Sequence, residues 1–252
     1  MKCLSNTVKI FGVEVSRCNL SQTSNIIFNH LESGNGPYLR EDLNAHKVNL
    51  MEDDPKIYEI IRSSDMINAD GASLIFAALA LKRVVLPRVT GCDLFSHLLR
   101  HSSSKKRRAY FIGATDFVLS ELLAYISSEF GSEVVAGAHN GYFDECEEKN
   151  IFRDISRVKP DFIFIGMPSP QKEFIAQRLR ESIHDTVVIM GVGGSFDVLS
   201  GHVKRAPIFV QKVGMEWLYR IYQEPKRLWK RYFFGNLTFV KRVLSDLVGR
   251  TR

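Results

Sequence analysis

The chain has 252 residues, of which 45% are hydrophobic and 25% are charged, a composition typical of a globular protein large enough to bury a sizeable core. These proportions exclude a disordered polyampholyte, a collagen-like repeat and a disulfide-stapled miniprotein. The net charge is +6, from 34 Lys and Arg against 28 Asp and Glu.

The N-terminal half alternates β-branched runs with amphipathic stretches. Residues 8–15, VKIFGVEV, predict a strand or hairpin, and the spacing of apolar residues predicts a helix over 21–31. Two weaker strand signals and two helical stretches follow, in the order 37–43, 46–51, 55–62 and 65–69, of which the first and last are the strands.

From residue 108 onward the alternation is clearer. Predicted strands lie at 109–113, 133–137, 161–166 and 186–191, and predicted helices at 115–130, 145–158 and 170–180. Strands that alternate with helices of this length indicate βαβ units. We therefore predict an α/β fold with a Rossmann-like, mostly parallel sheet and helices on both faces.

Glycines follow three of these strands, and they are candidate ligand-binding positions: Gly113, Gly166, and the group Gly191, Gly193 and Gly194. In an open parallel sheet ligands bind at the carboxyl ends of the strands, where glycine lets the backbone approach a phosphate. Each glycine alone fits an ordinary turn equally well. Three such loops in succession favour a nucleotide cleft.

Recognised cofactor and metal motifs are weak or missing in the sequence. GVGGSF at 191–196 lacks the third glycine and the downstream acid of a dinucleotide fingerprint, and there is no Walker A motif. The sequence contains no Asp-x-Asp pair, the spacing that typically holds Mg²⁺ or Mn²⁺ in sugar-nucleotide enzymes. Glu52, Asp53 and Asp54 precede Pro55, which favours a helix cap over a metal site. We expect neither a metal nor a cofactor.

Asp70 stands out among the acidic residues. It lies between a predicted strand and the apolar run that begins at Ala72, so its carboxylate is expected at the carboxyl edge of the sheet, where a general base would act. The alternative is an ordinary helix N-cap, a position at which Asp is favoured. The local pattern leaves both open.

Motifs spread along the chain add context. In order they are LNAHKVNL (43–50), NADGAS (68–73), RVTGCDLF (88–95), FIGA (111–114), GYF (141–143), IGMPSPQKEFI (165–175), GVGGSFDVLSGHVKRAP (191–207) and MEWLYRIYQEPKRLWKRY (215–232). Together, over about residues 40–235, they resemble the WecG/TagA/CpsF family of bacterial glycosyltransferases. The last two blocks are highly specific, whereas Asp-Gly alone would mean little.

The resemblance implies a metal-independent, inverting enzyme that moves a sugar from a UDP-sugar to a polyprenyl-diphosphate-linked saccharide in cell-surface polysaccharide synthesis. It places the general base at Asp70. Further residues that the resemblance assigns to substrate binding are Asn44, Arg88, Gln171, Arg220 and Arg227. Asp197, within GGSFD, is an additional candidate for substrate binding. The sugar is compatible with N-acetylmannosamine, its uronic acid or glucose.

Two positions depart from the family pattern. Asp42 stands where many members have Thr, two residues before the Asn, and a carboxylate there is expected to alter sugar selectivity or to raise the pKa of a neighbouring carboxyl group. In PSPQKE the Gln is kept as Gln171 but the acid moves to Glu173.

The C-terminal segment holds all of the positive excess. Residues 204–252 contain 12 Lys and Arg and 3 Asp and Glu, a net charge of +9, which leaves −3 for residues 1–203. Two stretches, 225–234 and 236–250, each combine an apolar face with basic residues, which is typical of helices at an anionic bilayer. Docking on the protein's own core or on a neighbouring subunit remains the alternative. We predict a catalytic domain over 1–203 and a membrane-associating appendage over 204–252 that also contributes to the active site.

The remaining features concern location and competing functions. The four cysteines are scattered, and we expect them to be reduced thiols. No apolar run is long enough for a signal peptide or a membrane span. We expect a protein peripheral to the cytoplasmic face of the inner membrane. A non-catalytic sugar-nucleotide-binding or scaffolding protein is the alternative function. Nucleic acid is not an expected partner, since no reader motif is present, whereas a homo-oligomer is compatible with the apolar tail.

Overall fold

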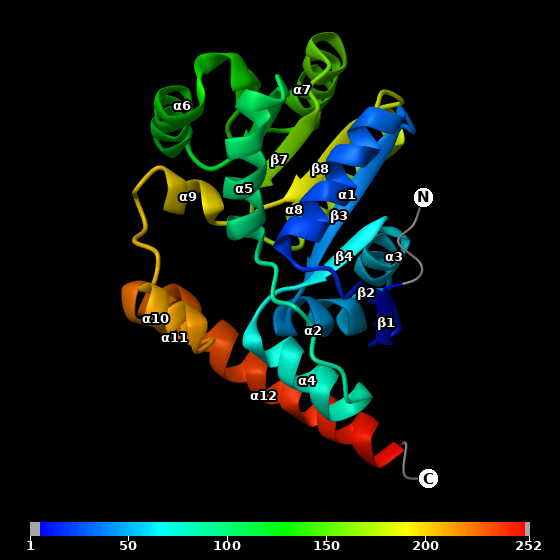
Figure 1. Cartoon of the computed structure of the whole chain (residues 1–252). Helices are drawn as coiled ribbons and strands as arrows, with labels where there is room; N and C mark the ends of the chain where they lie inside the picture. Colours follow the sequence, from blue (N-terminus) through cyan, green and yellow to red (C-terminus); the bar gives the residue numbers. More distant parts are fainter. Residues whose placement is uncertain (1–5, 250–252) are drawn as a thin grey trace.

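The computed structural model describes residues 6–249 and contains an eight-stranded sheet in the order β1-β2-β4-β3-β8-β7-β5-β6 (Figure 1). Only β1 and β2 pair antiparallel; the other neighbours are parallel. The strands are β1 (Thr7–Ile10), β2 (Val13–Ser16), β3 (Pro37–Leu43), β4 (Met66–Ala69), β5 (Ala109–Gly113), β6 (Val135–His139), β7 (Phe162–Gly166) and β8 (Val187–Gly191).

Helices connect the parallel strands, as the βαβ pattern requires. The helices of the α/β body are α1 (Leu20–Ser33), α2 (Ala45–Asp53), α3 (Pro55–Ser63), α4 (Ala72–Lys82), α5 (Gly91–Ser104), α6 (Asp116–Phe130), α7 (Glu145–Val158), α8 (Gln171–Ser182) and α9 (Ser195–Leu199). A short 3₁₀ turn, η1 (Ser132–Val134), precedes β6. Three further helices end the described chain: α10 (Ile208–Lys212), α11 (Glu216–Gln223) and α12 (Pro225–Gly249).

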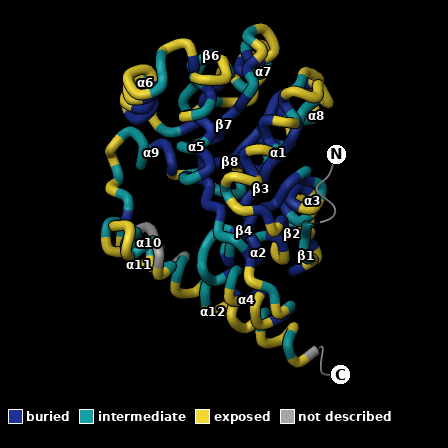
Figure 2. Tube along the Cα trace, viewed as in Figure 1, coloured by how far each residue is buried: buried dark blue, intermediate teal, exposed yellow. Residues whose placement is uncertain are grey.

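The two faces of the sheet form two separate hydrophobic cores, because side chains alternate along each buried strand. In β7, Ile163 and Ile165 pack into the core under α2, α3, α4, α7 and α8. Phe162 and Phe164 point the other way, into the core under α1, α5, α6 and α9. Figure 2 shows the central strands as the most deeply buried part of the molecule. The predicted two-sided, mostly parallel α/β fold is confirmed.

Most element boundaries agree with the sequence patterns to within two residues. The run 8–15 is a hairpin, since Phe11 and Gly12 both adopt the positive φ angles of a tight two-residue turn. The prediction at 133–137 was wrong at its start, where η1 precedes β6. The predicted pair of C-terminal segments is one continuous helix, α12, which runs through Gly235 without a break.

Part of α12 docks on the body of the protein, packing along α2 and α4 (Figure 1). Its Phe239 is buried, with its ring 5.6 Å from that of Phe11. Asn49 Nδ2 of α2 donates to the carbonyl oxygen of Gly235 at 2.8 Å, and Arg242 donates to the carbonyl of Val48 at 3.0 Å. The alternative that the tail packs on its own core therefore holds for one face of the helix. Across residues 6–249, no helix is both long and apolar enough to cross a bilayer.

Candidate active site

A cavity of about 570 Å³ lies at the carboxyl edge of the parallel strands, and α11 and residues 232–236 of α12 form part of its wall. Its size is in the range of small-ligand sites. Ten of the predicted site residues line it: Asp42, Asn44, Asp70, Arg88, Gly166, Gln171, Gly193, Gly194, Asp197 and Arg220. Sequence segments more than 150 residues apart thus meet at one site, where the strands' carboxyl ends converge.

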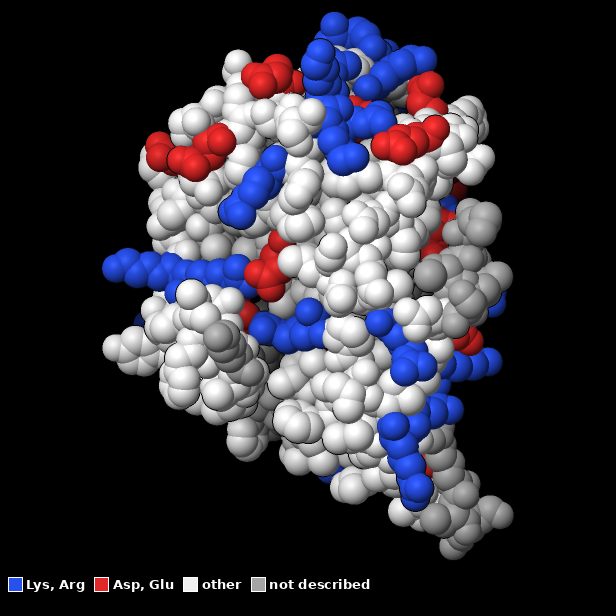
Figure 3. Space-filling model, viewed as in Figure 1, with Lys and Arg blue, Asp and Glu red and all other residues white. Residues whose placement is uncertain are grey.

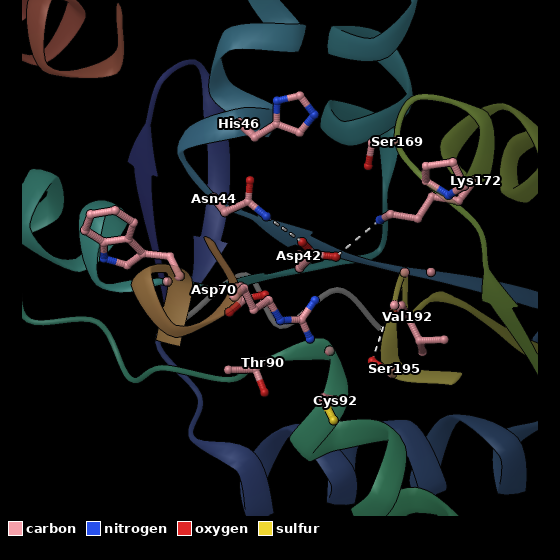
Figure 4. A pocket seen from close by; sticks show the side chains of 18 of the residues that line it. Asp42, Asn44, His46, Asp70, Thr90, Cys92, Ser169, Lys172, Val192 and Ser195 are labelled. Carbon is pink, nitrogen blue, oxygen red and sulfur yellow. Dashed lines mark hydrogen bonds and ion pairs between the residues drawn. The ribbon is translucent and has the colours of Figure 1, made fainter. Parts of the chain in front are cut away.

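Asp70 lies directly after β4 and faces this cavity (Figure 4). Its backbone N–H donates to the carbonyl of Leu43 at 2.8 Å, which fixes the residue between the ends of β3 and β4. The N-cap of α4 is Gly71, with φ +87°, and no side chain caps the helix. Among residues 6–249 no hydrogen bond to the Asp70 carboxylate occurs. The capping alternative is therefore wrong, and the carboxylate is free to accept a proton.

The surroundings of Asp70 raise the pKa of its carboxyl group to about 6. Burial is the largest cause, and the like charge of Asp42 is the next. Arg88 and Arg40 oppose this by favouring the ionised form, while Glu216 adds to the repulsion. A carboxylate with this pKa is ionised at neutral pH and is a stronger base than an ordinary aspartate, which suits proton abstraction.

Asp42 belongs to a buried cluster of three carboxylates and two ammonium groups. Lys47 pairs with Glu41, with Asp42 at 3.2 Å and with Glu173 at 3.0 Å. Lys172 pairs with Glu173 at 2.8 Å and with Asp42 at 3.5 Å. Although burial alone would raise the pKa of Asp42, the two lysines hold it well below its usual value. Asp42 is thus a permanent negative charge on the floor of the cavity.

Asn44 and Gln171 occupy the starts of two helices that point at the cavity. Asn44 caps α2 by accepting from the backbone N–H of Lys47 at 3.0 Å, and its Nδ2 donates to Asp42 at 3.2 Å (Figure 4). The amide oxygen is therefore committed to the fold. Gln171 is exposed at the first position of α8, next to Ser169 and Pro170. Its amide is available to a ligand.

The loop after β8 and Arg220 together form a candidate anion cradle. Gly193 has φ +52° and open space where a side chain would stand, and at Gly194 a Cβ would lie 3.4 Å from Nη1 of Arg220. Within residues 6–249 no backbone hydrogen bond engages the N–H groups of Gly193 and Gly194, and no ion pair engages Arg220. Free backbone N–H groups beside a guanidinium are suited to phosphate oxygens.

Arg88 joins the body of the protein to the C-terminal segment. Its Nη2 donates to Glu216 of α11 at 2.6 Å and its Nη1 to the carbonyl of Gln211 at 3.1 Å. Arg205 lies on the other side of Glu216 at 3.6 Å and pairs with Asp93 at 2.5 Å. Arg88 lines the cavity, but two of its nitrogens hold the appendage in place.

Two predicted residues stand apart from the cavity wall. Gly113 does not line it: a Cβ there would lie 2.4 Å from the carbonyl oxygen of Gly166, so the residue permits close packing of the loops after β5 and β7. Arg227 belongs to α12, but its side chain lies outside the described residues.

The structure also bears on the acidic cluster and the cysteines. Asp54 caps α3 by accepting from the N–H of Lys56 at 2.8 Å, so the predicted cap is confirmed. Within the part of the chain that is described, no three His, Cys, Asp or Glu side chains gather as metal ligands. Cys18, Cys92 and Cys146 are free thiols, while Cys3 lies outside the described residues.

Several residues at the site escaped residue-by-residue sequence reasoning. Lys172 lines the cavity beside Gln171, and Glu216 bridges two arginines. Trp217 and Tyr232 also line it, with ring centroids 5.9 Å apart. The only signal for these residues was their place inside the long motifs, since none forms a local chemical pattern.

The position of Asp42 predicts a change in pH dependence. Asp42→Asn removes a negative charge that raises the pKa of Asp70, so this pKa falls. The base acts when ionised, so wild-type kcat/KM is lost as pH falls through about 6, and the variant is expected to keep activity to lower pH. The measurement is the acidic limb of the pH profile of kcat/KM. Asp54→Asn, a remote cap at which Asn is equally suitable, should leave the limb in place.

Comparison with known proteins shows a family to which most of the chain is similar. The sequence model described as "Glycosyl transferase WecG/TagA/CpsF family" matches residues 8–252. A protein of Bacillus spizizenii (strain ATCC 23059 / NRRL B-14472 / W23) is 33% identical over 177 residues, which cover 70% of this chain and 67% of the relative. That relative is named N-acetylglucosaminyldiphosphoundecaprenol N-acetyl-beta-D-mannosaminyltransferase.

Proposed function

The chain belongs to the WecG/TagA/CpsF family of glycosyl transferases, and from this we propose that it transfers a sugar from a UDP-sugar to a polyprenyl-diphosphate-linked saccharide by a metal-independent, inverting reaction. The observation that carries the proposal is the pairing of one unbonded carboxylate, Asp70, with an anion cradle in a single cavity. A base for the acceptor and a site for a diphosphate are the two requirements of such a transfer.

The name of the Bacillus spizizenii relative suggests the substrates. Its name specifies a lipid-diphosphate-linked N-acetylglucosamine as acceptor and N-acetylmannosamine as the transferred sugar. We assign the same pair to this chain, with UDP as the leaving group. Asp42 and Asp70 place two carboxylates on the cavity floor, which favours an uncharged donor sugar over a uronic acid, because a third carboxylate would be repelled.

Asp70 acts on the acceptor. Its carboxylate takes the proton of the attacking hydroxyl while the oxygen forms a bond to the anomeric carbon on the face opposite UDP. The bond from that carbon to the diphosphate breaks in the same displacement, so the anomeric configuration inverts. The position of Asp70, held between β3 and β4 by its backbone bond to Leu43, keeps the base in place throughout.

The leaving diphosphate is stabilised by the protein's own donors. Gly193, Gly194 and Arg220 line the same cavity, and Nη1 of Arg220 lies close to Gly194, so their N–H groups are available together to the diphosphate. Such donors stabilise charge in a partly dehydrated site and substitute for the divalent cation that other sugar-nucleotide enzymes use. Because Arg220 belongs to α11, residues 204–252 complete a site whose base lies in the domain over 1–203.

The appendage also sets the location that we propose, which is the cytoplasmic face of the inner membrane. Its net charge of +9 attracts an anionic lipid surface, and a lipid-linked acceptor requires one. A scaffolding protein that only binds sugar nucleotides would account for the cradle and the basic tail. It would give no role to a carboxylate that is held at the cavity with a raised pKa.

The test is a panel of UDP-sugars, assayed for UDP release in the presence of an N-acetylglucosaminyl-diphosphate lipid. We expect UDP-N-acetylmannosamine to give acceptor-dependent release and its uronic acid to give little. Tight binding of a UDP-sugar with no release from any member of the panel would support the scaffolding alternative.

A further inference from the structure

Helix α4 is apolar on every side, yet it lies at the surface. From Leu74 to Leu81 it contains no polar residue. Leu74 and Ala78 are buried against the body, whereas Phe76 is 68% exposed and Leu79 47% exposed. A helix that is hydrophobic all round is normally covered by protein or by lipid.

This helix leads directly from the active site. Its first residues, Ala72 and Ser73, line the cavity immediately after Asp70. Phe76 and Leu79 lie about 6 and 10 Å further along the helix axis than Ala72. The exposed apolar side chains therefore begin about one helical turn beyond the part of α4 that lines the cavity.

The neighbouring helix α12 carries a matching surface. Along it Phe233, Leu237, Val240, Leu244 and Val248 recur every three or four residues and are between 48% and 64% exposed. Helices α4 and α12 pack against each other, so the two apolar surfaces belong to one end of the molecule (Figure 1).

Basic residues border this end. Lys82 and Arg83 close α4, and Lys241 is exposed on α12. Figure 3 shows a largely white surface over α4 and the adjacent helices, bordered by Lys and Arg. Exposed Phe and Leu beside basic side chains are the composition of an anionic bilayer interface.

We propose that the exposed side of α4, formed by Phe76, Leu79 and Val85 just beyond it, docks into an anionic lipid bilayer together with α12, so that the membrane contact is made by the catalytic domain as well as by the appendage. The inference rests on the proposed function, because the lipid chain of the acceptor then stays in the bilayer while its sugar reaches Asp70. Val85 is 67% exposed, which extends the surface past the end of α4.

The experiment is co-sedimentation of the full chain with vesicles of phosphatidylglycerol and phosphatidylcholine. Phe76→Ser combined with Leu79→Ser is expected to weaken partitioning by at least about tenfold, because two exposed apolar side chains no longer enter the interface. The matched control is Phe117→Ser combined with Tyr125→Ser on α6, where the two side chains are 61% and 38% exposed. The control should sediment as the wild type does. All four side chains are exposed, so unchanged melting temperatures verify the fold.

A second readout separates this inference from the proposed function. The α4 variant should lose transfer to a long-chain acceptor in vesicles and keep transfer to a short-chain acceptor in solution. Wild-type sedimentation by the α4 variant would overturn the docking face. The docking face would also be overturned if the α4 variant bound vesicles normally but changed its oligomeric mass, because a second copy of the chain would then be what covers the exposed side of α4. Failure of the wild type to release UDP with either acceptor would overturn the proposed function and leave the sedimentation result standing.

Discussion

Asp70→Asn is expected to lower kcat by about two to four orders of magnitude, the contribution typical of a general base. The amide has the same shape but cannot take the acceptor proton, so the chemical step fails while the cavity is preserved. Binding of UDP should be kept or slightly strengthened, because a negative charge near the diphosphate is removed. The measurements are steady-state UDP release and calorimetric titration with UDP.

Asp42→Asn is the matched control for this variant. It removes a carboxylate from the same floor of the cavity, but Lys172 and Lys47 hold the pKa of that carboxylate low, which makes it a poor base. It should turn over with an altered pH profile. Turnover by Asp70→Asn at the wild-type rate would contradict the assignment of the base.

Arg220→Ala is expected to lower kcat by about two to three orders of magnitude, the usual cost of losing one donor to a developing anion. The guanidinium lies over the loop at Gly194 and has no ion-pair partner within residues 6–249, so its removal costs the fold little. Arg220→Lys should recover part of the loss, because it restores the charge without the two-pronged geometry. The readouts are kcat and the affinity for UDP, with a short-chain acceptor so that membrane contact does not contribute.

Arg157→Ala is the control for this prediction. Arg157 is exposed near the end of α7 and pairs with Asp154 at 2.5 Å, and neither residue lines the cavity. It should behave as the wild type. Equal UDP affinity and kcat in Arg220→Ala and Arg157→Ala would contradict the proposal that residues 204–252 contribute to catalysis.

The sequence predicted the body of the fold because its signals are local. Strands such as 161–166 and helices such as 145–158 carry their own periodicity and caps, and Asp144 does cap α7 with both bonds of a capping box. Strand β3 gave a weak signal for a physical reason: Arg40, Glu41 and Asp42 are buried in it. Buried charges conceal a strand from any pattern based on hydrophobicity.

The parts of the site that the sequence did not predict depend on long-range pairing. The bond between Arg88 and Glu216 joins residues 128 positions apart, and that between Lys172 and Asp42 joins residues 130 apart. No local pattern encodes such pairs. The gathering of ten predicted residues around one cavity was within reach of sequence reasoning, because strand ends and motif order place them at one edge of the sheet.

The most direct measurement of the central claim is the initial rate of UDP release by the full chain with UDP-N-acetylmannosamine and an N-acetylglucosaminyl-diphosphate lipid, with and without excess chelator. The account predicts equal rates and a product with inverted anomeric configuration, since Arg220, the glycine loop and Asp70 supply all of the chemistry. A rate that is lost in chelator and restored by Mg²⁺ or Mn²⁺ would contradict it.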